Sequence, residues 1–176
     1  CAAALAAAKA GARVLLFERT DALLGTGQVG GIMRNNGRFT AAEEMTAMGA
    51  GELFELTDRL ARHRNLEFPG HKHASLYDVT LIEPEMEKLM ISAGVEVYLM
   101  SRVTGVRMNE CRILAVTLEN GNEAEGDAFV DATGTAGSQG NCSKYGNGCA
   151  MCVLRCPTFG PRVSLAAKAG ARELMA

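Results

Sequence analysis

The chain has 176 residues and a net charge of −2 at pH 7, and 48% of its residues are hydrophobic. A chain of this length and composition can bury a core of its own. It contains no basic block, and no apolar run approaches the roughly 18–20 residues that cross a bilayer. We therefore expect neither a nucleic-acid partner nor a membrane span.

The first predicted elements are a helix and a buried strand. Residues 1–10 form an Ala-rich helical pattern that opens on Cys1 with no capping residue before it, so we expect its natural start to be missing. Gly11 is placed as a left-handed cap at the end of this helix. The run Arg13–Glu18, "RVLLFE", is short and apolar and ends in an acid, which predicts a buried strand.

A glycine-rich loop is predicted over residues 19–38, where the sequence shows little periodicity. Repeated glycines favour a backbone that turns sharply or comes close to another molecule. The glycines of this loop are Gly25, Gly27, Gly30, Gly31 and Gly37.

Residues 40–64 are predicted to be mostly helical, with Gly49 and Gly51 dividing the stretch into two helices. His63 is placed near the C-terminal end of this helical stretch, where a positively charged imidazole interacts favourably with the negative end of the helix dipole. The side chains expected on the buried face are Met45, Met48, Leu53, Leu56 and Leu60.

A further helix is predicted over "EPEMEKLMISAG", residues 83–94, because Pro84 stands early in it and Gly94 lies past its end. Before this helix, His71 and His73 are expected in an exposed loop. Neither histidine has a third ligand nearby in the sequence, which argues against a metal site there.

Three strands are then predicted at residues 95–100, 102–108 and 111–119. The last two form a hairpin through Asn109 and Glu110. An acidic turn over residues 121–126 leads to a further apolar strand and small-residue turn over 128–134, "AFVDATG". This order predicts an α/β domain with a small β-meander insertion.

The heptapeptide "AAKAGAR" occurs twice, at residues 7–13 and 166–172. We interpret both copies as an Ala-rich helix that ends in a glycine cap. The second copy continues "ELMA" instead of an apolar strand, so it does not indicate a duplicated fold unit.

The helix, Gly11, strand and Glu18 match the second half of a dinucleotide-binding βαβ unit. In that unit an acid about 20 residues after the glycine fingerprint accepts hydrogen bonds from ribose hydroxyls. The spacing places Cys1 directly after the last glycine of G-x-G-x-x-G. We therefore expect the first strand and the phosphate-binding glycines to precede Cys1.

Most of residues 1–137 resembles the FAD-dependent oxidoreductases of the glutathione-reductase-like type. The resemblance is carried by "CAAALAAAKAGARVLLFER", the "LLGTG" loop, "EPEMEKLMISAGVEVYLMSRVTGVRMNECRILAVTLENG" and "AFVDATGTAG". It implies a Rossmann-like FAD-binding domain, here without its first strand.

The resemblance also implies which residues contact FAD. Glu18 matches the acid that binds the adenosine ribose, and Arg19 lines the same site. The loop that passes the pyrophosphate and flavin corresponds to Gly25, Thr26 and Gly27, with Thr26 where many relatives have a second glycine. Val103 matches a residue whose backbone contacts the adenine. The second flavin signature corresponds to Ala132, Thr133 and Gly134.

Four cysteines form a pattern of their own, C-x6-C-x2-C-x3-C-P. Its last three cysteines and the proline match the end of the bacterial ferredoxin run, whereas the first interval is longer than that run allows. An iron–sulfur cluster of the 4Fe–4S type, tetrahedral zinc, a redox dithiol and a turn without any cofactor are the alternatives. The candidate metal ligands are Cys142, Cys149, Cys152 and Cys156.

The resulting prediction is an FAD-dependent oxidoreductase whose flavin is coupled to a Cys-ligated iron–sulfur centre. It acts on a small-molecule substrate or an electron-carrier partner, and no catalytic residue is assigned. The alternatives are a non-catalytic zinc-binding module and a thiol/disulfide reductase that uses Cys149 and Cys152. Clustered cysteines suit a reducing compartment, so a cytoplasmic location is expected. The predicted parts are an FAD-binding domain (1–139), a Cys-rich segment (140–160) and the start of a helical element (161–176).

Overall fold

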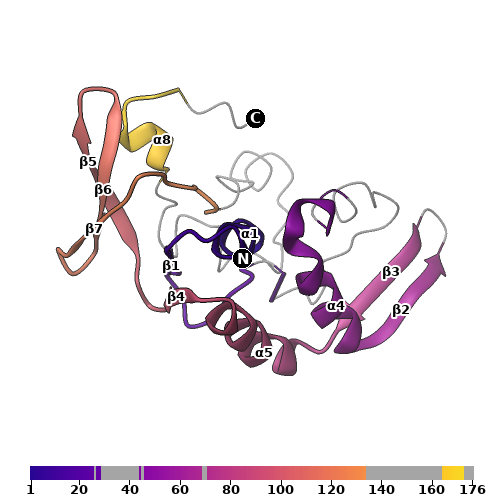
Figure 1. Cartoon of the computed structure of the whole chain (residues 1–176). Helices are drawn as coiled ribbons and strands as arrows, with labels where there is room; N and C mark the ends of the chain where they lie inside the picture. Colours follow the sequence, from indigo (N-terminus) through magenta and orange to yellow (C-terminus); the bar gives the residue numbers. More distant parts are fainter. Residues whose placement is uncertain (26, 29–43, 45, 69–70, 134–163, 173–176) are drawn as a thin grey trace, which may run out of the picture. The chain divides into compact units, whose positions relative to one another are not determined.

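The computed structural model describes residues 1–176 except 26, 29–43, 45, 69–70, 134–163 and 173–176. The chain divides into two compact units, unit 1 (Cys1–Met100) and unit 2 (Ser101–Ala176). Both combine helices with small sheets (Figure 1). The predicted boundaries after residues 139 and 160 fall outside the described residues and stay predictions.

Unit 1 opens with helix α1 (Ala2–Lys9), which ends in a Schellman turn. Gly11 has φ +88°, and the N–H groups of Gly11 and the next residue donate to carbonyls of the last helical turn at 2.9 and 3.0 Å. A β-carbon is strained in this left-handed conformation, so glycine is required. Strand β1 (Val14–Phe17) follows, which confirms both predicted elements.

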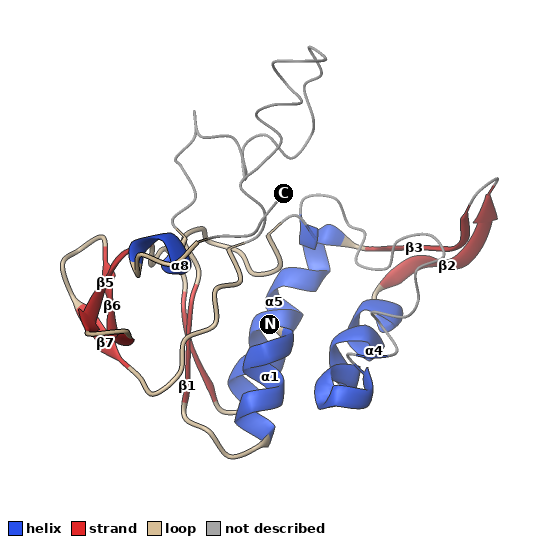
Figure 2. Cartoon of the chain, turned by 90° about the horizontal axis from the view of Figure 1, so that it is seen from above, coloured by secondary structure: helices blue, strands red, loops and turns tan. Residues whose placement is uncertain are grey.

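Unit 1 contains a parallel strand pair that lies beside α1 (Figure 2). Strand β4 (Val95–Tyr98) pairs with β1 so that Val14 lies opposite Val95 and Phe17 opposite Tyr98. The rings of Phe17 and Tyr98 stack with their centroids 5.2 Å apart. In parallel strands the carboxyl ends meet at one edge, where open α/β sheets bind their ligands.

The predicted helical stretch divides at Gly49, as expected. A π-helical turn, η1 (Thr46–Ala50), precedes helix α4 (Gly51–Arg59), and Gly49 between them has φ +97°. Leu53 and Leu56 are buried as predicted. The prediction for Met48 is wrong: its side chain is 69% exposed, because it precedes the turn that redirects the chain.

A β-hairpin replaces the predicted end of this helical stretch. Strands β2 (Ala61–Phe68) and β3 (His71–Tyr77) pair antiparallel. In "ARHRNLEF" the apolar residues do not continue the helical spacing of Leu53 and Leu56. A longer helix would therefore add no apolar side chain to the buried face of α4. His63 therefore lies in a strand opposite Leu76, and His71 and His73 lie in β3 instead of a loop.

Helix α5 (Val79–Ser92) begins earlier than predicted, so Pro84 lies inside it. Its end is confirmed, since Gly94 has φ +86° directly after the C-cap Ala93. The helix packs Ile82, Met86 and Met90 into the core of unit 1, and all three are 0% exposed. Leu5 of α1 and Leu23 join them among the most buried side chains.

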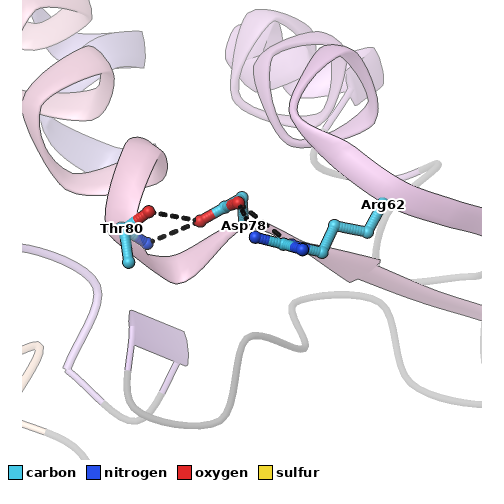
Figure 3. Close-up of polar contacts among 3 residues, drawn as sticks. All are labelled: Arg62, Asp78 and Thr80. Carbon is cyan, nitrogen blue, oxygen red and sulfur yellow. Dashed lines mark hydrogen bonds and ion pairs between the residues drawn. The ribbon is translucent and has the colours of Figure 1, made fainter.

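Asp78 joins the hairpin to helix α5 (Figure 3). As the N-cap residue, its Oδ1 accepts hydrogen bonds from the Thr80 N–H at 2.9 Å and the Thr80 hydroxyl at 2.6 Å. Its Oδ2 accepts from the Arg62 guanidinium on β2. The Asp78 N–H donates to the Leu60 carbonyl at 3.0 Å, so this residue fixes where the hairpin ends and the helix begins.

Replacing Asp78 with alanine is expected to lower the melting temperature at neutral pH by a few degrees, the order expected for a lost helix cap. Hydrogen bonds from Thr80, with a contribution from Arg62, hold the pKa of Asp78 below its ordinary value of 3.8. The stabilisation is therefore complete above that value and is lost as pH falls through the lower folded-state pKa.

Thermal melts of the wild type and Asp78→Ala should consequently converge as the pH falls below about 4. Asp127→Ala is the control, because the Asp127 side chain is fully exposed in unit 2. A melting difference that persists unchanged at low pH would contradict the charged-cap explanation.

Unit 2 contains an antiparallel meander of β5 (Val103–Asn109), β6 (Arg112–Leu118) and β7 (Glu123–Glu125). The first two strands form the predicted hairpin, with Glu110 in its turn at φ +50°. The predicted acidic turn instead contains β7, because Arg107 on β5 forms ion pairs with both glutamates of that strand at 2.8 and 2.6 Å. These pairs offset the charge repulsion between the two carboxylates.

The strand predicted over residues 128–134 is absent from its described part, residues 128–133. Val130 is 69% exposed. Asp131 Oδ1 accepts hydrogen bonds from the Thr133 N–H at 3.0 Å and the Thr133 hydroxyl at 2.6 Å. This Asx turn uses the Thr133 N–H, a donor that pairing with another strand would need. The turn therefore explains why these residues do not form the strand that their apolar pattern predicts.

The second copy of "AAKAGAR" repeats the helix ending of the first. Helix α8 (Leu165–Lys168) ends at Gly170, which has φ +75°. The Gly170 N–H donates to Ala167 at 3.1 Å and the next N–H to Ala166 at 2.9 Å, the same hydrogen bonds that end α1. The interpretation of both copies as helix and glycine cap is confirmed.

Candidate functional site

Glu18 lies at the carboxyl end of β1, beside β4. Its N–H donates to the Tyr98 carbonyl at 2.9 Å, which extends the parallel pairing by one residue. Its Oε1 accepts hydrogen bonds from the Thr20 N–H at 2.8 Å and the Thr20 hydroxyl at 2.9 Å. These bonds fix the carboxylate in a half-buried position at the sheet edge. Arg19 follows in the bend after the strand and is half-buried.

The Leu23–Gln28 loop, named here for its first part, has a turn at Leu23–Gly25 and helical conformation at Gly27 and Gln28. Leu24 has φ +73° and Gly25 has φ +51°. Apart from its chain neighbours, no atom of the described residues lies within 4 Å of a β-carbon built on Gly25, so this side of its backbone is open among them. The N–H groups of Gly27 and Gln28 donate to the carbonyls of Leu24 and Gly25 at 2.9 and 3.1 Å. Thr26, the third predicted contact of this loop, lies outside the described residues.

Tyr77, at the end of β3, is a site-forming residue that the sequence reasoning missed. Its hydroxyl donates to the Gly27 carbonyl at 2.6 Å, and the side chain is buried. The two residues are fifty positions apart, and a tyrosine after a polar stretch carries no local signal for such a contact. The letters "PG" before His71, a pair typical of turns, were the available sequence signal of a hairpin.

Val103 is the first residue of β5 and is half-buried. It lies opposite Leu118 of β6, and the ladder shifts register before Gly105. A register shift of this kind leaves backbone groups near Val103 outside the regular ladder. Val103 belongs to unit 2, whereas Glu18, Arg19, Gly25 and the remaining loop residues belong to unit 1.

Ala132 and Thr133 lie in the exposed Asx turn after Asp131, and Gly134 lies outside the described residues. The other carboxylate oxygen of Asp131 accepts a hydrogen bond from the Leu165 N–H at 2.9 Å. One carboxylate therefore contacts the residues on both sides of segment 134–163. Cys142, Cys149, Cys152 and Cys156 all belong to that segment and lie outside the described residues.

Groups of three or more His, Cys, Asp or Glu side chains suited to a metal ion are absent from the part of the chain that the structure describes. Of the two described cysteines, Cys1 is half-buried and Cys111 is exposed, and neither forms a disulfide. Cys111 lies in the turn that directly precedes β6. No described helix has the length and apolar character of a membrane span.

A protein-family model described as "FAD dependent oxidoreductase" matches residues 1–137 of the chain. Curated proteins give no match. Among solved structures, the Diels-Alderase PyrE3 of the pyrroindomycin biosynthetic pathway matches with 20% sequence identity and a TM-score of 0.48. The match covers 71% of this chain but only 28% of PyrE3, so the chain spans less than a third of that protein's length.

Proposed function

Because the chain belongs to the family of FAD-dependent oxidoreductases, we propose that unit 1 binds the adenosine and pyrophosphate parts of FAD in a redox enzyme. Glu18 accepts hydrogen bonds from the adenosine ribose, with Arg19 beside it. The loop residues Gly25, Thr26 and Gly27 line the path of the pyrophosphate and flavin. This part of the proposal follows the glutathione-reductase-like arrangement.

The position of Glu18 is the observation that carries the proposal. Its carboxylate lies at the carboxyl edge of two parallel strands, where the Glu18 N–H donates to the Tyr98 carbonyl. Thr20 donates two hydrogen bonds to Oε1 of Glu18 and so orients the carboxylate. In the proposal, the other carboxylate oxygen accepts hydrogen bonds from the ribose hydroxyls. Gly25 is open on one side among the described residues, so its backbone is accessible to a phosphate. These residues fit an adenine dinucleotide.

The remaining predicted contacts come from unit 2. Val103 offers backbone groups to the adenine, and Ala132, Thr133 and Gly134 form the second flavin-binding turn. Asp131 orders this turn through the two hydrogen bonds from Thr133. When bound, FAD supplies the redox chemistry, since a flavin takes up a hydride and releases electrons one at a time.

We further propose that Cys142, Cys149, Cys152 and Cys156 ligate an iron–sulfur cluster that exchanges electrons with the flavin. The support is their spacing and the proline after the last cysteine. Asp131 also accepts hydrogen bonds from Thr133 and Leu165, described residues that lie close in sequence to the two ends of the segment with the thiols.

The test is an anaerobic absorption spectrum and metal analysis of the chain after incubation with FAD and removal of unbound flavin. Retained flavin bands in the near-ultraviolet and blue support FAD binding, whereas their absence contradicts it. Iron with acid-labile sulfide supports the cluster. Zinc at one equivalent supports the alternative metal site, and zinc without any retained flavin favours a non-catalytic zinc module.

A thiol/disulfide reductase makes a different prediction from a cluster protein. Its activity requires Cys149 and Cys152 and tolerates serine at Cys142 and Cys156. A four-cysteine cluster site instead loses iron after any of the four substitutions. Metal analysis of the four Cys→Ser variants therefore separates these two functions.

A further inference from the structure

We propose that Tyr77 is a positioning residue for FAD: its hydroxyl, with Gln28 and Glu83, holds the Leu23–Gln28 loop in the conformation that presents Gly25 to the cofactor. This inference rests on the proposed FAD-binding function of the loop. It adds three side chains of unit 1 that sequence reasoning assigned to no role.

Three polar contacts connect the loop with the segment Tyr77–Glu83. The Tyr77 hydroxyl donates to the Gly27 carbonyl at 2.6 Å, and Gln28 Nε2 donates to the Val79 carbonyl at 2.6 Å. Burial raises the pKa of Glu83, and the nearby backbone N–H of Leu23 opposes this effect by lowering it. The Gly27–Gln28 end of the loop is thus hydrogen-bonded to the end of β3 and the start of α5, and its Leu23 end lies close to Glu83 of α5.

The backbone of the loop requires such support. Leu24 occupies the left-handed region at φ +73°, a conformation that a non-glycine residue adopts only when surrounding contacts enforce it. Leu23 beside it is 1% exposed and packs in the core of unit 1. A strained residue enforced at a cofactor-facing loop is the pattern found at functional sites.

Gly27 fits the same interpretation. A β-carbon at this position would lie 3.1 Å from the Tyr77 hydroxyl oxygen, closer than most real contacts. Gly27 does not have a positive φ, so the close approach of Tyr77, and not the backbone conformation, disfavours a side chain here: a β-carbon would require the hydroxyl or the loop to shift by a few tenths of an ångström. The hydroxyl is a permanent donor, since burial raises the pKa of Tyr77 to about 12.

The first test compares Tyr77→Phe with the wild type. The variant keeps the buried ring and removes only the hydroxyl, so the fold is retained. We expect the Kd for FAD to rise about threefold to tenfold, as for the loss of one hydrogen bond. We also expect faster amide exchange at Gly27 and Gln28, and a shifted absorption spectrum of the bound flavin.

Tyr98→Phe is the matched control. Its hydroxyl is bonded only two residues away, to Glu96 at 3.0 Å, and the side chain is 42% exposed. This variant should match the wild type in FAD affinity, loop exchange and flavin spectrum. A merely structural effect of Tyr77→Phe would lower the melting temperature of the apoprotein without changing the flavin spectrum.

A double-mutant cycle with Gly27→Ala tests the contact itself. In the wild-type background this substitution forces the loop away from the Tyr77 hydroxyl and should weaken FAD binding. In the Tyr77→Phe background the hydroxyl is gone, so the same substitution should have a smaller effect. Additive effects of the two substitutions would overturn the proposed contact.

The experiment separates failure of this inference from failure of the proposed function. If the wild-type chain binds no FAD, the proposed function fails, and loop exchange in apoprotein still decides whether Tyr77 holds the loop. If the wild type binds FAD and Tyr77→Phe matches Tyr98→Phe in affinity, exchange and spectrum, the positioning role is overturned while FAD binding stands.

Discussion

Replacing Met86 with alanine is expected to destabilise unit 1 by about 2–5 kcal/mol, the range for truncating a fully buried methionine. Met86 is 0% exposed and belongs to the core cluster of unit 1. The lost side chain leaves a cavity, and α4 and β4, which pack against α5, cannot both move inward to fill it. The measurement is urea unfolding followed by circular dichroism.

Met48→Ala provides the control because it is the same chemical change at an exposed position. Met48 is 69% exposed on the π-helical turn before α4. Its substitution should change the free energy of unfolding by no more than about 0.5 kcal/mol. Similar unfolding midpoints for the two variants would contradict the burial of Met86 in the core of unit 1.

Replacing Glu18 with glutamine is expected to weaken FAD binding about 10–100-fold, the effect of losing charged hydrogen bonds to the ribose. Glutamine preserves the length of the side chain, and its carbonyl oxygen still accepts the bonds from Thr20 that orient it. The change therefore removes charge while keeping geometry. Isothermal titration with FAD measures the difference.

Glu96→Gln is the matched control for this experiment. Glu96 lies in β4, where its carboxylate contacts Arg13 at 2.8 Å and the Tyr98 hydroxyl at 3.0 Å. Adjacent side chains of a strand point to opposite faces of the sheet. Val97 packs against the core, so the neighbouring Glu96 side chain points away from it. Equal FAD affinity in the two Glu→Gln variants would exclude Glu18 from the ribose site.

Elements with strong local signals were predicted well. Helices α1 and α5 both end at a glycine with positive φ, because glycine alone adopts that conformation without strain. The buried positions of Leu53 and Leu56 on α4 followed from the helical spacing of the leucines. The β5–β6 hairpin followed from two apolar runs that flank a polar pair.

Elements stabilised by distant contacts were predicted poorly. Nothing within "ARHRNLEF" shows that it pairs with the residues after Gly70, and the short strand β7 depends on two ion pairs with Arg107. The apolar residues "AFV" predicted a strand, whereas the Asx turn at Asp131 follows them and no strand forms over residues 128–133. In each case the deciding partner is a side chain or strand remote from the pattern.

The candidate site shows the same division between local and distant information. The sequence by itself determined that an acid, Glu18, follows a short strand after a glycine-capped helix, because that order depends on neighbouring residues. Only the tertiary structure decided that Tyr77 contacts Gly27 and that Asp131 contacts Leu165. Those contacts join residues 50 and 34 positions apart, so they form only when the intervening elements have packed.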